Sequence, residues 1–153
     1  GTPDLLAEAA RRSFQAKAAL VARDFREEKG RRELLNLGHT YGHVAETQAN
    51  ISHGRAVALG LAVAVELSRS LAGLAEAEAE RITAVAEGLG GPWPPQPPAA
   101  EVRRLLKADK KIRGGALRFI ALAAPGRPRL LEVTADDILE AAARVFRYGR
   151  RSR

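Results

Sequence analysis

All three histidines of the chain fall within fifteen residues, at positions 39, 43 and 53. His39 and His43 are four residues apart, and a helix would place both imidazoles on one face, one turn apart. His53 comes ten residues later, and an antiparallel return of the chain would bring it back toward the pair. Three neutral imidazoles suit Zn²⁺ or a similar divalent ion, and a catalytic site also keeps an open position for a substrate oxygen.

The same spacing is also found among ordinary surface or core histidines, so the surrounding residues must distinguish a metal site from ordinary histidines. No histidine occurs elsewhere, and Gly38 and Gly42 flank the pair, each at a cost of about 1 kcal/mol in a helix. That cost indicates close approach by another backbone or a ligand. In a third interpretation two of the histidines are ligands and the other carries a proton, because its pKa lies near neutrality. Glu46 is either a further carboxylate for the site or a charge on the helix surface.

The elements that position these residues are predicted to be mostly helices. Apolar residues make up 46% of the chain and aromatic residues 5%, so the core must be built from Ala, Leu and Val, which favours closely packed helices. The first helix should bury Leu5, Leu6 and Phe14. The patterns predict helices over about residues 3–23, 32–48, 55–71, 75–87, 99–108 and 134–146, and two strands over 116–122 and 129–133. We therefore expect a mainly α fold of about six helices with one small β-hairpin, with residues 1–153 forming a single domain.

Composition excludes several kinds of site and partner. There are no cysteines, which excludes disulfides and thiolate metal sites. The net charge is +7, but the basic residues are not interleaved with aromatic ones, so we expect no nucleic-acid partner, whereas a small anionic substrate fits the charge. No signal peptide and no long apolar run is evident, so we expect a cytoplasmic protein without a membrane partner.

The run from Arg32 to Glu46, which contains Leu-Asn-Leu-Gly-His-Thr-Tyr-Gly-His, resembles 3-dehydroquinate synthase, as does the His-Gly-Arg-Ala-Val-Ala run that starts at His53. The lead-in 17–24 and the Asp-Lys-Lys motif at 109–111 are also similar to that sugar-phosphate cyclase family, and the match spans about residues 13–145 in one order. The resemblance implies the C-terminal half of a 3-dehydroquinate synthase-like fold.

The resemblance also implies an activity. The family converts DAHP, a keto-sugar-acid phosphate, to 3-dehydroquinate in the shikimate pathway of aromatic amino acid biosynthesis, as a lyase that releases phosphate and closes a ring. The family uses NAD transiently and a divalent metal, Zn²⁺ or Co²⁺. The resemblance also suggests that the protein is a homodimer. Nothing here resembles the family's N-terminal NAD-binding domain, and a third metal ligand, a glutamate, would precede this chain. We therefore expect no cofactor-binding residues here, a need for that domain in cis or in trans, and an incomplete catalyst.

Residue roles follow from motif position. The resemblance implies that His39 and His53 are metal ligands and that His43 and Glu28 transfer protons. The chain is about one residue longer than usual between Lys17 and Arg32, so Glu27 is the neighbour that could replace Glu28.

The resemblance also implies a set of substrate contacts, which are Lys17, Arg32, Asn36 and one of Lys110 and Lys111. Arg and Lys are the natural partners of a carboxylate and a phosphate. Arg32 and Asn36 would share one face of the predicted helix 32–48 with His39 and His43.

Two departures from the family pattern leave alternatives open. The interval from His43 to His53 is about two residues shorter than usual, and Arg55 stands where the family often has Glu. The alternatives are a related cyclase that makes an aminocyclitol precursor, and a non-catalytic metal-binding or interaction module descended from the enzyme.

Overall fold

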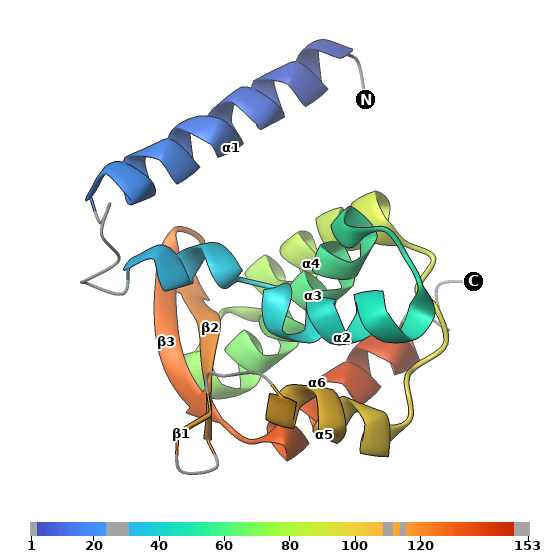
Figure 1. Cartoon of the computed structure of the whole chain (residues 1–153). Helices are drawn as coiled ribbons and strands as arrows, with labels where there is room; N and C mark the ends of the chain where they lie inside the picture. The colour runs from blue at the N-terminus through green and yellow to red at the C-terminus, as the bar shows by residue number, and fades with distance from the viewer. Residues whose placement is uncertain (1–2, 24–30, 109–111, 114–115, 149–153) are drawn as a thin grey trace. The chain divides into compact units, whose positions relative to one another are not determined.

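The computed structural model describes residues 3–23, 31–108, 112–113 and 116–148 (Figure 1). They form two compact units, residues 1–36 and 37–153. The first unit contains α1 (Pro3–Arg23), as predicted, and the 3₁₀ helix η1 (Arg31–Asn36). Leu5, Leu6 and Phe14 of α1 are 65%, 64% and 73% exposed, so their predicted burial is wrong for this unit, which is too small to build a core around them. That residues 1–153 form one domain stays a prediction.

The second unit is mainly helical with a small antiparallel sheet, which confirms the predicted fold class. Its sheet has the order β1-β2-β3, and β1 adds a two-residue strand to the predicted hairpin. The elements in chain order are α2 (His39–Ala49), α3 (His53–Leu67), the π-helical turn η2 (Ser68–Ala72), α4 (Glu76–Gly90), α5 (Ala99–Ala108), β1 (Ile112–Arg113), β2 (Ala116–Ala124), β3 (Arg127–Val133) and α6 (Ala135–Tyr148).

Helix α3 lies at the centre of this unit. It packs against α2, α4, α6 and β2, and Figure 1 shows α2, α3 and α4 side by side. Its sequence is apolar almost all round, as expected of a helix that neighbours cover on several sides. The core is dominated by Ala, Leu and Val, and its largest fully buried side chains include Tyr41, Leu59, Phe119 and Ile138.

The predicted continuous helix 32–48 is wrong. Gly38 has φ +79°, in the left-handed region, and separates η1 from α2. A Cβ at Gly38 would lie 2.9 Å from the backbone nitrogen of Leu61, so close packing against α3 and the turn both require glycine here. The predicted single face shared by Arg32, Asn36, His39 and His43 is therefore wrong as well.

Several boundaries also differ from the prediction. Helix α3 begins at His53 rather than at residue 55, and α4 continues to Gly90 rather than to residue 87. At the other end of α3, the Ser68 hydroxyl donates to the carbonyl of Ala64 at 2.6 Å and accepts from the amide of Leu122 at 2.9 Å. This buried hydroxyl ties the helix end to β2 beside a bulge, where the strand pairing shifts.

Among the described residues, no helix is both long enough and apolar enough to cross a membrane.

Candidate metal centre

The two helices that carry the histidines pack through glycines. A Cβ on Gly60 of α3 would lie 1.8 Å from the carbonyl oxygen of Gly38 and 2.7 Å from the amide nitrogen of Gly42. Gly38 lies against Leu61, whereas Gly42, further along α2, lies against Ala56, so the two helices are antiparallel. The predicted close backbone approach at Gly38 and Gly42 is confirmed, and it brings the start of α3 beside the histidine face of α2.

The three imidazoles converge as the spacing predicted. The ring centroids of His39 and His53 are 5.5 Å apart, those of His39 and His43 are 5.7 Å apart, and those of His43 and His53 are 6.4 Å apart. Two imidazoles on one tetrahedral Zn²⁺, with Zn–N of about 2.1 Å, have centroids about 5 Å apart. The His39–His53 pair comes nearest to that value, and the His43–His53 pair is furthest from it.

Hydrogen bonds set the orientation of two of the rings. Nδ1 of His39 lies 3.2 Å from the carbonyl oxygen of Leu37, and Nδ1 of His53 lies 3.1 Å from Oε2 of Glu46. A carbonyl and an ionised carboxylate only accept hydrogen bonds, so Nδ1 carries the proton in each neutral ring and the lone pair is on Nε2. Metal-ligating histidines typically show this arrangement, in which the second ring nitrogen donates to a carbonyl or a carboxylate.

His43 differs from the other two histidines. Its side chain is exposed, and within the described part of the chain no hydrogen-bond partner fixes its ring. This ring lacks the orienting hydrogen bond that is typical of a metal ligand, so its position suits a proton carrier better than a ligand.

Taken alone, the described residues do not make a full ligand set. Across residues 3–23, 31–108, 112–113 and 116–148, no group of three or more His, Asp or Glu side chains is arranged to hold a metal ion. A pair of imidazoles with oriented Nε2 atoms nevertheless fits part of a zinc shell.

Arg55, one of the departures from the family pattern, has a structural role in this chain. Its Nε donates to the carbonyl of Gly90 at 3.1 Å, and its Nη2 donates to the carbonyl of Pro92 at 2.8 Å. Arg55 thereby ties the first turn of α3, two residues after His53, to the segment that follows α4.

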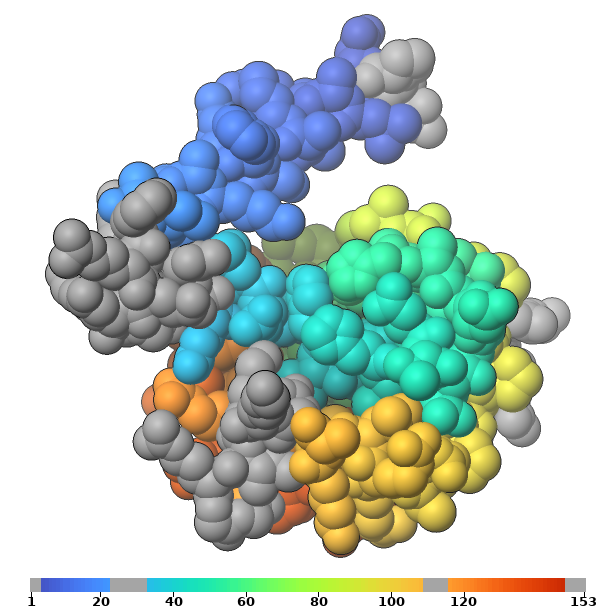
Figure 2. All heavy atoms as spheres, in the orientation of Figure 1, coloured from blue at the N-terminus to red at the C-terminus, as the bar shows by residue number. Residues whose placement is uncertain are grey.

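The histidine helix α2 also carries a buried polar group. Tyr41 is 0% exposed, burial raises the pKa of its hydroxyl, and that hydroxyl has no hydrogen-bond partner among the described residues. Figure 2 shows α2 and α5 next to each other on one face of residues 37–153, consistent with their direct contact.

The other predicted site residues lie either in the first unit or outside the described residues. Lys17 is exposed on α1, Arg32 is in η1, and Asn36 is the partly buried last residue of η1. All three belong to the unit 1–36, whose placement relative to the histidines is not determined. Glu28, Glu27, Lys110 and Lys111 lie outside the described residues, so their roles stay predictions.

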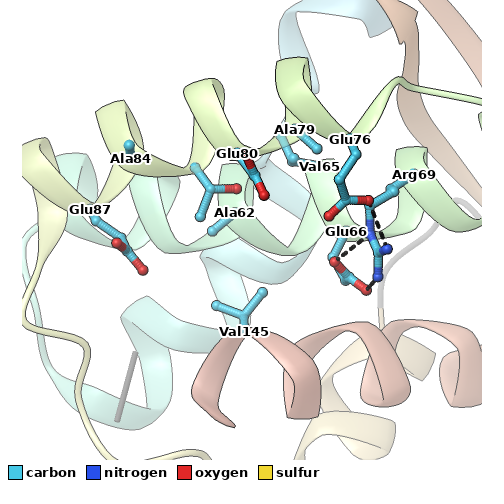
Figure 3. Close-up of a pocket in the computed structure, with 11 residues that line it drawn as sticks. Ala62, Val65, Glu66, Arg69, Glu76, Ala79, Glu80, Ala84, Glu87 and Val145 are labelled. Carbon is cyan, nitrogen blue, oxygen red and sulfur yellow. Dashed lines mark hydrogen bonds and ion pairs between the residues drawn. The ribbon is translucent and has the colours of Figure 1, made fainter. Parts of the chain in front are cut away.

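A separate cavity of about 360 Å³ lies among α3, α4 and α6 (Figure 3). No histidine lines it. Glu66, Arg69 and Glu76 line one end, and the Glu66 carboxylate accepts hydrogen bonds from Arg69 at 2.7 Å and from Arg144 at 3.1 Å. Burial by itself raises the pKa of Glu66, but these hydrogen bonds and charges outweigh burial and hold the pKa below its usual value.

Comparison with known proteins decides the family. Residues 2–112, well over half of the chain, match the family described as 3-dehydroquinate synthase C-terminal. The chain belongs to this family. The histidine motif and the glycine seam between α2 and α3 both fall inside the matched region.

Curated relatives in the 3-dehydroquinate synthase family agree. The chain is 44% identical over 128 residues to the 3-dehydroquinate synthase of Halorhodospira halophila, which covers 81% of this chain and 36% of the relative. It is 43% identical over 139 residues to that of Aeropyrum pernix, which covers 89% of this chain and 38% of the relative. The chain thus spans well under half the length of these relatives.

A solved structure shares the fold. A 2-deoxy-scyllo-inosose synthase complexed with carbaglucose-6-phosphate, NAD⁺ and Co²⁺ superposes with a TM-score of 0.76 at 23% identity, covering 93% of this chain and 41% of that one. A second structure of a 2-deoxy-scyllo-inosose synthase gives a TM-score of 0.71. These similarities show that the chain shares its fold with part of the 2-deoxy-scyllo-inosose synthase chain.

Sequence reasoning missed two contacts at the centre. The sequence pattern assigns no role to Gly60, although a glycine inside an apolar helix is a signal of close backbone packing. The sequence leaves two interpretations of Glu46 open and does not predict its bond to His53. The signal was present, because Glu46 is seven residues after His39 and three after His43, on the same helical face.

Proposed function

We propose that this chain is the metal- and substrate-binding domain of a 3-dehydroquinate synthase, which converts DAHP to 3-dehydroquinate with release of phosphate. The observation that carries the proposal is the convergence of His39, His43 and His53 within the family motif, with Nδ1 of His39 and of His53 held by acceptors. Curated relatives at 43–44% identity bear this name.

In this proposal the residues of the chain divide the work. His39 and His53 present Nε2 to Zn²⁺ or Co²⁺, which when bound polarises a substrate oxygen as a Lewis acid. His43, together with Glu28, carries protons to and from substrate oxygens, because its ring is exposed and unanchored.

The remaining predicted residues handle the charges of the substrate. Lys17, Arg32, Asn36 and one of Lys110 and Lys111 would bind its carboxylate and phosphate. An NAD-binding domain, in cis or in trans, and a further metal ligand would complete the enzyme. The 2-deoxy-scyllo-inosose synthase of similar fold is complexed with NAD⁺ and Co²⁺, which supports these two cofactors. A cytoplasmic homodimer completes the proposal, and sedimentation of the complete protein tests the dimer.

The three histidines provide a matched experiment on the metal. Zn²⁺ is titrated into the chain and into its variants His39→Ala, His53→Ala and His43→Ala. We expect the first two variants to bind at least about 100-fold more weakly, because each loses a ligand, and the third to stay within about tenfold of the parent chain. Equal affinity in all four chains would overturn the ligand assignment.

Activity is tested separately. The chain joined to an NAD-binding domain should release phosphate from DAHP when NAD⁺ and Zn²⁺ are supplied, and His43→Ala should lose most of the rate while it still binds metal. General acid–base groups contribute about 10²–10⁴-fold. Release from other sugar phosphates but not from DAHP would favour the aminocyclitol alternative, and release from none of them would favour the non-catalytic module.

A further inference from the structure

We propose that Glu46 is a positioning residue for His53: its carboxylate holds the His53 ring with the proton on Nδ1 and the lone pair on Nε2, turned toward His39. This inference rests on the proposed metal function. It goes further by giving a role to a side chain that is neither a ligand nor a substrate contact in that proposal.

The contact itself is specific. Oε2 of Glu46 lies 3.1 Å from Nδ1 of His53, across seven residues and between two helices. The side chains of Glu46 and His53 are 39% and 56% exposed, so water competes for both groups. The contact forms nevertheless because α2 and α3 meet through Gly42 and Gly60, which fixes the distance between their backbones.

The geometry separates Glu46 from the ligands. In an imidazole ring, Nδ1 and Nε2 point in divergent directions, so a carboxylate bonded to Nδ1 lies on the far side of the ring from a metal bound at Nε2. Glu46 therefore acts through His53.

The three imidazole rings differ in what orients them. His39 is oriented by the backbone carbonyl of Leu37, which no substitution removes. His53 is oriented by a side chain, and His43 by no described hydrogen bond. Glu46 is thus an orienting contact that mutation can remove while all three histidines remain. Outer contacts of this kind typically change metal affinity by about 10–100-fold when removed.

The experiment compares Glu46→Ala and Glu46→Gln with Glu80→Ala. Glu80 is an exposed glutamate on α4. The end of α4 near the histidines is Gly90, whose carbonyl accepts a hydrogen bond from Arg55. Glu80 lies ten residues before Gly90, about 15 Å away along the helix axis. Its loss removes the same charge without touching a histidine. Zn²⁺ affinity is measured by competition with a chelator. The tautomer of His53 is read from ring ¹⁵N shifts of the metal-free chain, and far-UV circular dichroism verifies folding.

We expect Glu46→Ala to bind Zn²⁺ about 10–100-fold more weakly and to lose the Nδ1–H preference of His53. Glu46→Gln should fall between Glu46→Ala and the parent chain, because its amide oxygen accepts the hydrogen bond without the charge. Glu80→Ala should match the parent chain in both measurements.

The outcomes separate the two proposals. Zinc affinity that is equal in the parent chain and in His53→Ala would overturn the proposed metal function. Zinc binding that depends on His53, while Glu46→Ala keeps either the parent affinity or the parent tautomer, would overturn the positioning role alone.

Discussion

The histidine cluster and the network around Glu66 both gather ionisable side chains in residues 37–153, but they do so in opposite ways. In the network, Glu66 accepts from Arg69 and Arg144, and those arginines also pair with Glu76 and Glu140. In the cluster, three like groups converge, and two of them have Nδ1 engaged by an acceptor outside the cluster.

The difference teaches how to separate a structural cluster from a functional one. Opposite charges that satisfy each other leave little capacity for a ligand, so the Glu66 network joins α3, η2, α4 and α6 and stabilises their packing. Imidazoles brought together without satisfying each other keep capacity for a shared partner. The close packing of α2 against α3 at Gly42 and Gly60, which we call the seam, positions the histidines, whereas ion pairs hold the Glu66 network together. A substitution that adds volume should therefore affect the histidine cluster, and one that removes a charge should affect the network.

The largest expected effect is at the seam, from Gly60→Ala. The added Cβ would meet the carbonyl oxygen of Gly38 at 1.8 Å, and backbone atoms cannot move aside as a flexible side chain can. We expect a loss of about 3 kcal/mol or more in the free energy of unfolding, measured by urea denaturation. Gly88→Ala on α4 is the matched control, because nothing lies within 4 Å of its Cβ position. It should gain about 0.5–1 kcal/mol. Equal effects of the two substitutions on the free energy of unfolding would contradict the close packing of α2 against α3 at Gly60.

An intermediate effect is expected in the network, from Glu66→Gln. The side chain of Glu66 is 12% exposed, so losing its charge should cost about 2 kcal/mol at about pH 7 and leave Zn²⁺ affinity unchanged. Glu80→Gln, in the same cavity lining but exposed, should change stability by less than about 0.5 kcal/mol.

The pH dependence of this effect has a definite sign. The pKa of Glu66 is lowered in the folded chain, so its stabilisation is fully present above its unfolded pKa of about 4.3 and is lost as pH falls through the folded value. The stability gap between the parent chain and Glu66→Gln should therefore shrink as the pH is lowered below about 4. A gap that stays constant or widens on acidification would contradict the ion-pair account.

The smallest effect is expected at Tyr41, with the opposite sign. Its buried hydroxyl has no described partner, so Tyr41→Phe should be neutral or should stabilise the chain by up to about 1 kcal/mol. Ser68→Ala is the contrasting variant, because it leaves the buried amide of Leu122 without its acceptor and should cost about 1–3 kcal/mol. Thermal unfolding of both variants checks this. A destabilised Tyr41→Phe would mean that the hydroxyl is hydrogen-bonded in solution.

The sequence by itself determined the fold class, the family and the residues of the histidine cluster. The preference of Ala and Leu for helices depends on local chemistry, and the extents of α1 and α5 agree with prediction. The spacing of His39 and His43 determined a shared helical face, because that signal arises within one helix. Gly38 and Gly42 predicted a close backbone contact, but not which element makes it.

Only the tertiary structure decided what depends on a second element. Gly38 can adopt the left-handed conformation because it has no Cβ, and α3 leaves no room for one, so the helix breaks where the sequence pattern predicts continuation. The bond between Glu46 and His53 likewise requires α2 and α3 to meet at one distance and in one register. A sequence shows which side chains can bond, but contacts between elements are determined by packing, and this is why His53 acquires its orientation only in the folded chain.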